Sequence, residues 1–508
     1  ENFDFLIRDN WHVMYGLMQQ IISRFQKTLN LQVTYSTHIF TVLPISKERD
    51  NDQKCGIICR HLEDSLSNIG PSYYLSREIV NELLGIEDIN LEFKKLNSSE
   101  HYPPLDNLVS KLENEYNNII LQSDSEKTNW TEWCLYMGDR FLLTLNANSG
   151  INNQEVVDVV NFINNNVPVH LSIERHLLIF HDDNHSTPQN TKKFLNEIKP
   201  IKNHYHLEKN NKKDFDRVAR IITGNSIGLA LGGGGARGNA HIGVYKAFIE
   251  NDIPIDIVCG TSAGGIIAGG IASRFSPDDL IDHFKKINDL RMFKEYTLPF
   301  SSLIKTNKVL KISKMFSGER QIEDLWLTMF ACCVDISAAK LKILDEGPLW
   351  EAIWATGALP GILLPVVRDG ALLVDGGIAN NLPGDILIER YGGKLIAVNV
   401  SPEKEMIPSF KEFPNQSRLL LKKIFFKKKF EKEYGTMNIP TLGNILMRAV
   451  MASSAHKVKE VAKMSHIFLN PPIEKYGMMD FEAVDELVEL GYKYTMNELE
   501  KYDLTKLF

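Results

Sequence analysis

Two glycine-rich turns near the middle of the chain constrain its fold more than any other feature. The turns are 232–238 and 260–264, and the strand-like apolar runs before them are 227–231 and 255–259. A segment with helical character follows each turn, so the order strand, turn, helix occurs twice. This order is typical of an α/β fold with a mostly parallel sheet, in which functional groups gather at the carboxyl ends of the strands. Both turns are predicted to lie at such ends.

The second turn places a serine between two glycines, Gly260-Thr261-Ser262-Ala263-Gly264. This is the G-x-S-x-G pattern, in which a sharp turn from strand to helix exposes the serine hydroxyl to a substrate. Ser262 is therefore the candidate nucleophile. A serine hydroxyl also needs a base that takes its proton, and donors for the oxyanion that its attack creates.

The first turn is suited to supply those donors. Its sequence from 232 to 238 is Gly-Gly-Gly-Gly-Ala-Arg-Gly. Glycines let the backbone approach a substrate closely, and consecutive N–H groups can point at one oxygen, with an arginine adding positive charge. The predicted oxyanion region consists of Gly233, Gly234, Gly235, Arg237 and Gly238.

The same glycines also fit a dinucleotide-binding fingerprint, which is the alternative interpretation. That interpretation requires an acidic residue at the end of the next strand, where it would hold a ribose hydroxyl. The strand ends instead in Cys259-Gly260-Thr261-Ser262, and no Gly-Lys-Ser/Thr of a phosphate-binding loop follows the glycines. Two such turns in tandem favour a hydrolase.

Asp375 is the candidate base. It ends the apolar run 371–374 and precedes Gly376-Gly377, so a sharp turn would leave its carboxylate exposed to a partner. A triad would need a histidine after the acid, and His456 and His466 both lie in 453–466, which is predicted as a lysine-studded helix. We therefore favour a two-member site, which requires a partly desolvated Asp375 and a strong oxyanion hole.

Together these motifs resemble the patatin-like phospholipase family, whose catalysis depends on a Ser–Asp dyad. The stretches 229–238, 321–326 and 375–383 are similar to the neuropathy target esterase branch of that family. The resemblance covers about 205–480 closely and 1–205 more distantly. It implies a three-layer α/β/α catalytic domain with Ser262 as nucleophile and Asp375 as base. Ala263 is a departure, since relatives often carry a bulkier residue after the serine.

The resemblance also implies the reaction. It is the hydrolysis of fatty acyl esters of phospholipids or lysophospholipids through an acyl-enzyme, with no metal or other cofactor and no need for calcium. Acyl transfer to another acceptor would use the same residues, and a lipid-sensing scaffold without turnover is the third alternative. The sequence leaves open the headgroup, the acyl chain and the oligomeric state.

The 508 residues are predicted to form three parts. Residues 1–34 contain an amphipathic helix that resembles the last helix of a cyclic-nucleotide-binding domain, but no nucleotide site is expected in this chain. Residues 35–205 alternate between strand and helix patterns, which predicts a small connecting α/β domain. A charged linker, 204–216, is expected to lead into the catalytic domain at 206–508.

Composition excludes several other classes. A net charge of −7 argues against a general nucleic-acid binder. The six cysteines and the histidines from His170 to His206 lack metal-ligand spacing, so no metal site is predicted. No apolar run is long enough to span a membrane, and no signal peptide is evident. We expect an intracellular protein, peripheral on the cytoplasmic face of a membrane.

One stretch combines positive charge with aromatic side chains and is the candidate for membrane contact. It contains Lys422, Lys423, Phe425, Phe426, Lys427, Lys428, Lys429 and Phe430. Lysines attract anionic headgroups, and phenylalanines can enter the acyl boundary. The alternative is an ordinary helix with a solvated cationic side. A second segment, 287–303, would line an acyl pocket or belong to the core.

Overall fold

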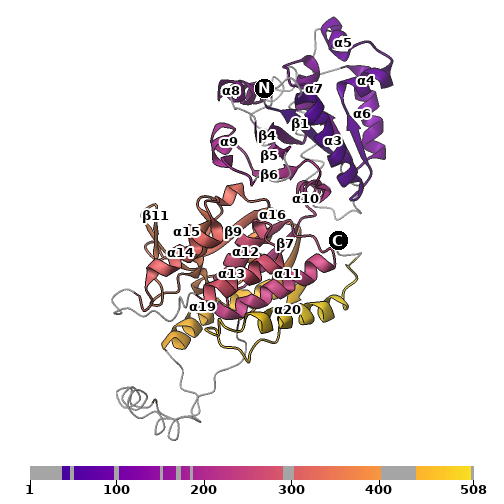
Figure 1. Ribbon diagram of the computed structural model, residues 1–508. Helices are drawn as coiled ribbons and strands as arrows, with labels where there is room; N and C mark the ends of the chain where they lie inside the picture. Colours follow the sequence, from indigo (N-terminus) through magenta and orange to yellow (C-terminus); the bar gives the residue numbers. More distant parts are fainter. Residues whose placement is uncertain are drawn as a thin grey trace, which may run out of the picture.

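The computed structural model describes residues 37–45, 51–96, 102–148, 153–166, 173–182, 187–289, 302–401, 413 and 442–504. These residues form two β-sheets, each covered by helices, in a smaller α/β unit followed by a larger one (Figure 1). The predicted α/β class is confirmed. The expected helix within 1–34, the stretch 422–430 and residues 290–301 of the segment 287–303 lie outside the described residues.

Six parallel strands form the first sheet, in the order β2-β3-β1-β4-β5-β6. The strands are β1 (His38–Pro44), β2 (Ser72–Leu75), β3 (Asn118–Gln122), β4 (Arg140–Asn146), β5 (Glu174–His181) and β6 (Asn203–Glu208). The helices are α3 (Asn51–Ser67), α4 (Arg77–Leu84), α5 (Ile89–Leu96), α6 (Pro103–Glu115), α7 (Asn129–Met137), α8 (Asn153–Asn166) and α9 (Thr191–Glu197). Helices cover both faces of this sheet, so the central strands are continuous apolar runs.

The expected charged linker at 204–216 is wrong in its first half, because β6 continues through it. β6 pairs in register with β5, from His176 opposite Asn203 to His181 opposite Glu208. His206 is buried on this edge strand, a position that its polarity did not suggest. Because β6 spans Asn203–Glu208, the expected boundary at about 205 falls inside a strand. Helix α10 (Lys212–Ile222) follows and packs on α3.

The second sheet has the order β11-β12-β9-β8-β7-β13-β14, with β10 paired to β9. Its strands are β7 (Ile227–Leu231), β8 (Ile257–Thr261), β9 (Thr328–Asp335), β10 (Lys340–Leu344), β11 (Val366–Arg368), β12 (Ala371–Asp375), β13 (Lys394–Val398) and β14 (Ile467–Leu469). The five strands from β9 to β14 along this order run parallel, whereas β10, β11 and β12 form antiparallel pairs. The sheet is thus mostly parallel, as the sequence predicts.

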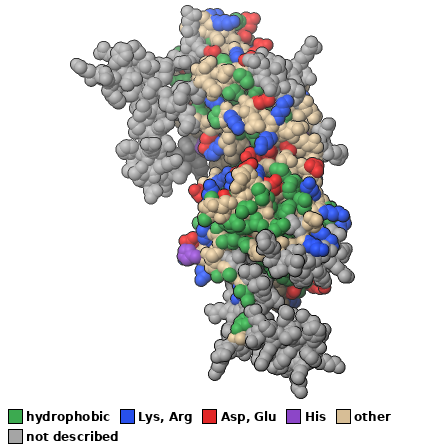
Figure 2. Space-filling model, turned by 90° about the vertical axis from the view of Figure 1, so that its left-hand side faces the viewer, with side chains coloured by type: hydrophobic (Ala, Val, Ile, Leu, Met, Phe, Trp, Pro, Cys, Tyr) green, Lys and Arg blue, Asp and Glu red, His purple; other side chains and the backbone are tan. Residues whose placement is uncertain are grey.

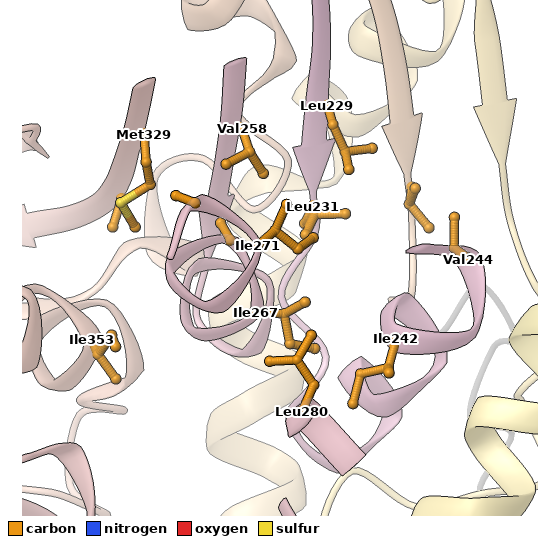
Figure 3. Close-up of a cluster of buried hydrophobic side chains, with 14 of the residues drawn as sticks. Leu229, Leu231, Ile242, Val244, Val258, Ile267, Ile271, Leu280, Met329 and Ile353 are labelled. Atoms are coloured by element: carbon orange, nitrogen blue, oxygen red, sulfur yellow. The ribbon is translucent and has the colours of Figure 1, made fainter. Parts of the chain in front are cut away.

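Helices cover both faces of this second sheet. They are α11 (Ala240–Glu250), α12 (Ala263–Ala272), α13 (Pro277–Asp289), α14 (Thr306–Ser317), α15 (Leu349–Gly357), α16 (Gly384–Tyr391), α19 (Leu442–Met464) and α20 (Val484–Leu499), with short 3₁₀ turns η1 (Gly235–Asn239), η3 (Ile322–Asp324) and η4 (Gly376–Ile378). Leu229 and Leu231 face a core that contains Ile267 of α12, as Figure 3 shows. Ala230 between them faces the opposite core with Leu387 of α16. The predicted three-layer α/β/α arrangement is confirmed.

Strands β8 and β12 meet end to end along the same side of β9. Ala331 and Cys332 pair with β8 on one side and with β10 on the other. Cys333 to Asp335 pair with β12 and β10, so β12 occupies the side that β8 has left. Thr261 at the end of β8 is opposite Cys332, and Asp375 at the end of β12 is opposite Cys333. This register brings the two predicted catalytic residues to one place.

Candidate active site

Ser262 lies in the sharp turn between β8 and α12. Its backbone has φ 55° and ψ −126°, a conformation that residues with side chains rarely adopt and that the surroundings must hold. The Ser262 N–H donates to Oγ1 of Thr356 at 2.9 Å, and this hydroxyl donates to the Cys332 carbonyl at 2.6 Å. Thr356 therefore connects the strained turn to β9.

The two glycines around Ser262 allow backbone segments to approach each other. A Cβ on Gly260 would lie 2.3 Å from the carbonyl carbon of Gly264. A Cβ on Gly264 would lie 2.2 Å from the carbonyl oxygen of Leu231, at the end of β7. The nucleophile turn is thus packed directly against the glycine turn that follows β7.

Asp375 ends β12 and is 3% exposed. Its Oδ1 accepts a hydrogen bond from Gly377 N–H at 2.8 Å, and its own N–H donates to the Ala358 carbonyl at 3.0 Å. The Ser262 side chain lies within hydrogen-bonding reach of the Asp375 carboxylate. The structure therefore brings the predicted nucleophile and the predicted base into direct contact.

Burial determines the acidity of Asp375. Loss of solvation raises its pKa to about 6, and the hydrogen bonds from Gly377 N–H and Ser262 oppose this rise. A carboxylate with a pKa near neutrality is a stronger base than an ordinary aspartate, yet it is still ionised at pH 7. A two-member site requires a partly desolvated Asp375, and its burial and raised pKa meet this requirement.

The glycine turn after β7 has two backbone donors free. Gly232 N–H donates to the Val398 carbonyl at 3.0 Å, and Gly233 N–H donates to the Asn381 carbonyl at 3.1 Å. Within the described part of the chain, no hydrogen bond uses the N–H of Gly234 or Gly235. These two groups are therefore available as donors to an oxyanion, while Gly233 approaches Ser262 closely, because a Cβ on Gly233 would lie 3.0 Å from the Cβ of Ser262.

Arg237 holds the glycine turn in place with two of its guanidinium nitrogens, while its Nη1 is buried and has no hydrogen-bond partner among the described residues. Its Nε donates to the Tyr476 carbonyl at 2.8 Å, and its Nη2 donates to the Glu474 carbonyl at 3.4 Å. The side chain is buried, and desolvation lowers its pKa. Arg237 therefore holds the turn against the segment after β14. Gly238 has a packing role, because a Cβ there would lie 2.4 Å from the Cβ of Ala263.

Asn381 is a residue of the site that the sequence did not single out. Its Nδ2 donates to the Gly233 carbonyl at 3.0 Å and to Ser401 Oγ at 2.7 Å. Together with the backbone bond from Gly233 N–H, this holds the glycine turn from both sides of Gly233. Asn381 lies within 375–383, one of the stretches that are similar to the neuropathy target esterase branch. That similarity was the signal in the sequence that could have identified Asn381. Thr356 gave no comparable signal.

The two histidines that follow Asp375 in sequence lie away from this contact. His456 is on α19 with its side chain 83% exposed, and its Nδ1 lies 3.4 Å from a carboxylate oxygen of Glu460. His466 accepts a hydrogen bond from the Leu395 N–H at 3.2 Å, at the start of β13. Neither is bonded to Ser262 or Asp375, so the geometry fits a two-member site better than a triad. Among the described residues, no group of three His, Cys, Asp or Glu is arranged to hold a metal ion.

Comparison with known proteins identifies both units. Residues 229–388 match the model of the patatin-like phospholipase family, and residues 36–213 match the model of the Neuropathy Target Esterase family P-loop like domain. The second match extends past the expected boundary at 205 and includes β6.

Three relatives match most of the chain. Patatin-like phospholipase domain-containing protein 7 of Rattus norvegicus is 28% identical over 475 residues, which are 85% of this chain and 33% of the relative. Patatin-like phospholipase domain-containing protein 6 of Homo sapiens is 28% identical over 468 residues, 85% of this chain and 32% of the relative. Neuropathy target esterase sws of Drosophila melanogaster is 28% identical over 474 residues, 86% of this chain and 32% of the relative.

The chain spans about a third of the length of these relatives. The matched region nevertheless includes both units in the same order, together with Ser262 and Asp375 within the patatin-like segment. The chain therefore carries a patatin-like phospholipase domain and a P-loop like domain of the Neuropathy Target Esterase family, and it is similar to the neuropathy target esterase relatives over 85–86% of its length.

Proposed function

We propose that this chain hydrolyses fatty acyl esters of phospholipids, and lysophospholipids in particular, through an acyl-enzyme on Ser262. The observation that carries the proposal is the approach of Ser262 to the buried Asp375, which the register of β8 and β12 on β9 brings together. The free N–H groups of Gly234 and Gly235 support it, because they belong to the turn whose Gly233 lies against Ser262. Similarity to a family of lipid hydrolases favours hydrolysis over a scaffold without turnover.

Acylation begins when Ser262 Oγ attacks the ester carbonyl and its proton passes to Asp375. Negative charge develops on the carbonyl oxygen, where the N–H groups of Gly234 and Gly235 stabilise it. The glycerophospho-alcohol then leaves with the proton that Asp375 returns, and the acyl group stays on Ser262.

Deacylation repeats these steps with water as the nucleophile. Asp375 takes a proton from the water, the hydroxide attacks the acyl-enzyme carbonyl, and the fatty acid leaves as Ser262 recovers its proton. Each step moves a proton between an oxygen and Asp375, so no metal or other cofactor is required. Independence from calcium is part of the proposal.

The substrate is an amphiphile, so the proposal includes contact with a membrane surface from the cytoplasmic side. In the described part of the chain, no helix combines the length and the apolar character needed to cross a bilayer. The stretch 422–430 is the sequence-based candidate for peripheral contact, with lysines for headgroups and phenylalanines for the acyl boundary. The unit before β7 is proposed as a connecting domain.

An activity-based label tests the nucleophile directly. A fluorophosphonate should form a covalent adduct on Ser262, and peptide mass spectrometry should locate it there. The same preparation should release fatty acid from lysophosphatidylcholine, and the label should abolish that release. An adduct at another residue, or release that continues after complete labelling of Ser262, would contradict the proposal.

A further inference from the structure

His241 is a buried histidine beside the glycine turn that follows β7, and the proposed reaction steps give it no role. It is the second residue of α11 and is 0% exposed. Figure 2 shows few histidine atoms on the face that it views, and His241 contributes none to the molecular surface. A polar ring in the interior costs stability unless its nitrogens find partners, so the contacts of His241 are informative.

One ring nitrogen of His241 is bonded to the glycine turn, and the other has no partner among the described residues. Nε2 lies 2.8 Å from the Gly232 carbonyl oxygen, whereas Nδ1 is buried and unpartnered. A carbonyl oxygen can only accept, so Nε2 carries the proton and donates it. Burial lowers the pKa of His241 to about 4, against the opposing effect of the bond to Gly232, so the ring is neutral at pH 7. Leucine would fill the space without an unpartnered nitrogen, so packing alone does not account for a histidine here.

The chain between Gly232 and His241 folds back on itself. Nine residues separate the two, and the 3₁₀ turn η1 (Gly235–Asn239) lies between them. Helix α11 is fixed by Ile242 and Val244, which belong to the buried cluster in Figure 3. His241 is therefore carried by a rigid element while its ring reaches the start of the glycine turn.

The Gly232 carbonyl lies between His241 and the nucleophile turn. A Cβ on Gly264 would be 2.8 Å from this carbonyl oxygen. The next residue, Gly233, is as close to the nucleophile, because a Cβ on Gly233 would lie 3.0 Å from the Cβ of Ser262. A rotation of the peptide between Gly232 and Gly233 would therefore disturb both turns.

Two consecutive peptide groups of the glycine turn are fixed by side chains. The first joins Gly232 to Gly233: its carbonyl accepts from His241, and its N–H donates to the Asn381 carbonyl at 3.1 Å. The second joins Gly233 to Gly234, and its carbonyl accepts from Asn381 Nδ2 at 3.0 Å. Its N–H, on Gly234, is one of the two donors proposed for the oxyanion. The direction of this N–H therefore depends on His241 as well as on Asn381.

We propose that His241 is a positioning residue for the hydrolysis, because its Nε2–H holds the Gly232 carbonyl and thereby aims the N–H groups of the glycine turn at the oxyanion. Donors that are held in place before the reaction stabilise the developing charge without reorganisation. The ring is bonded to the turn and not to Ser262 or Asp375, so His241 does not act as the base. This inference rests on the proposed function and adds a residue to it.

The experiment compares substitutions of His241 that differ in one donor. His241→Leu removes the Nε2–H, whereas His241→Gln keeps an amide N–H at the same distance from the backbone. His241→Asn keeps the amide but is too short to reach Gly232, and it serves if the leucine variant does not fold. The matched control is His176→Leu on β5, because His176 is also buried and its Nδ1 is hydrogen-bonded to the Tyr205 hydroxyl at 3.2 Å.

Each chain is assayed on a short-chain ester below its critical micelle concentration, with a trifluoromethyl ketone as an inhibitor that forms a tetrahedral adduct. His241→Leu and His241→Asn should lower kcat about 10–100-fold and weaken ketone binding in parallel, with KM nearly unchanged. His241→Gln should lose no more than about threefold in kcat, because the donor is kept. His176→Leu should lower the melting temperature without changing kcat or ketone binding.

A double variant supplies a readout that loss of packing does not move. If His241 and Asn381 hold the same turn, His241→Leu/Asn381→Ala should lose less in kcat than the product of the two single losses. Independent, multiplicative losses would overturn the inference, as would equal losses in His241→Leu and His241→Gln, or normal ketone binding by His241→Leu. An unaltered chain that neither cleaves the ester nor binds the ketone would refute the proposed function and this inference with it. An active unaltered chain that His241→Leu leaves unimpaired would overturn this inference alone.

Discussion

The hydroxyl of Ser262 lies within hydrogen-bonding reach of the carboxylate of Asp375, although 112 residues separate them in sequence. The contact follows from strand register, because β8 and β12 end at adjacent positions, Cys332 and Cys333, along the same side of β9. A base held by a strand end, with its partner in a strained turn, needs little rearrangement before proton transfer. The predictions below test what this arrangement requires.

The activity should depend on the ionisation of Asp375. Burial raises the pKa of Asp375 to about 6, and only its ionised form can accept a proton from Ser262. We therefore expect kcat/KM on a soluble ester to fall tenfold per pH unit below about 6 and to level off above it. His456→Ala should show the same profile. An acid limb that moves in this variant would point to a histidine as the base.

Asp375→Asn should make the protein more stable at neutral pH while it removes activity. Between pH 3.8, the ordinary pKa of an aspartate, and about pH 6, Asp375 keeps its proton in the folded chain but loses it in the unfolded chain. The free energy of unfolding therefore falls as the pH rises through this range. Above about pH 6 the full cost of the buried charge, roughly 2–3 kcal/mol, is present. Asparagine has no such cost.

Thermal unfolding measures this effect. The melting temperature of Asp375→Asn should exceed that of the unaltered chain at pH 7.5, and the difference should shrink toward pH 4. A variant that melts at a lower temperature at pH 7.5 would show that the carboxylate stabilises the fold.

Thr356→Val should slow catalysis without unfolding the chain. The substitution keeps the volume but removes the acceptor for Ser262 N–H and the donor to the Cys332 carbonyl. We expect kcat to fall on the order of 10–100-fold with KM nearly unchanged, because the strained turn loses its support. Thr495→Val is the matched control, since Thr495 is equally buried and donates to Gly491 on α20. Equal losses in the two variants would contradict a local role.

Asn381 should act as a positioning residue for the oxyanion turn. Asn381→Ala removes the hydrogen bonds to the Gly233 carbonyl and to Ser401. We expect kcat to fall by about 10–100-fold, and the affinity for a trifluoromethyl ketone, which forms a tetrahedral adduct, to fall in parallel. KM should change little.

The control for this effect is Asn118→Ala, a buried asparagine of β3 that is hydrogen-bonded to Ser72. It should lower stability without changing inhibitor affinity. If Asn381→Ala loses stability alone and binds the ketone normally, Asn381 is a structural residue only.

Local patterns were sufficient to single out the candidate nucleophile and the candidate base. The G-x-S-x-G turn and the Asp-Gly-Gly turn each depend on a few consecutive residues, so both were visible in the sequence. The sequence did not reveal that Ser262 and Asp375 lie close together, because their proximity arises from the register of β8 and β12 on β9. Thr356 belongs to the same class, because its role comes from a contact across 94 positions.

Burial explains the features that the sequence misplaced. β6 looked like a charged linker because His204, His206 and Glu208 are polar, but its register with β5 places them in a sheet edge at the junction with the second unit. The sequence also did not reveal that two nitrogens of the Arg237 guanidinium are bonded to the carbonyls of Tyr476 and Glu474. Direction of a side chain is set by tertiary contacts, which a local motif does not encode.

The most direct test of the account is fatty acid release from lysophosphatidylcholine in the presence of EDTA by the unaltered chain, Ser262→Ala, Asp375→Asn and His456→Ala. A metal-free dyad predicts that the unaltered chain and His456→Ala are equally active. Ser262→Ala and Asp375→Asn should each lose about three to four orders of magnitude in kcat, with all four chains folded by circular dichroism. Activity that EDTA abolishes, or that Asp375→Asn retains, would contradict the central claim.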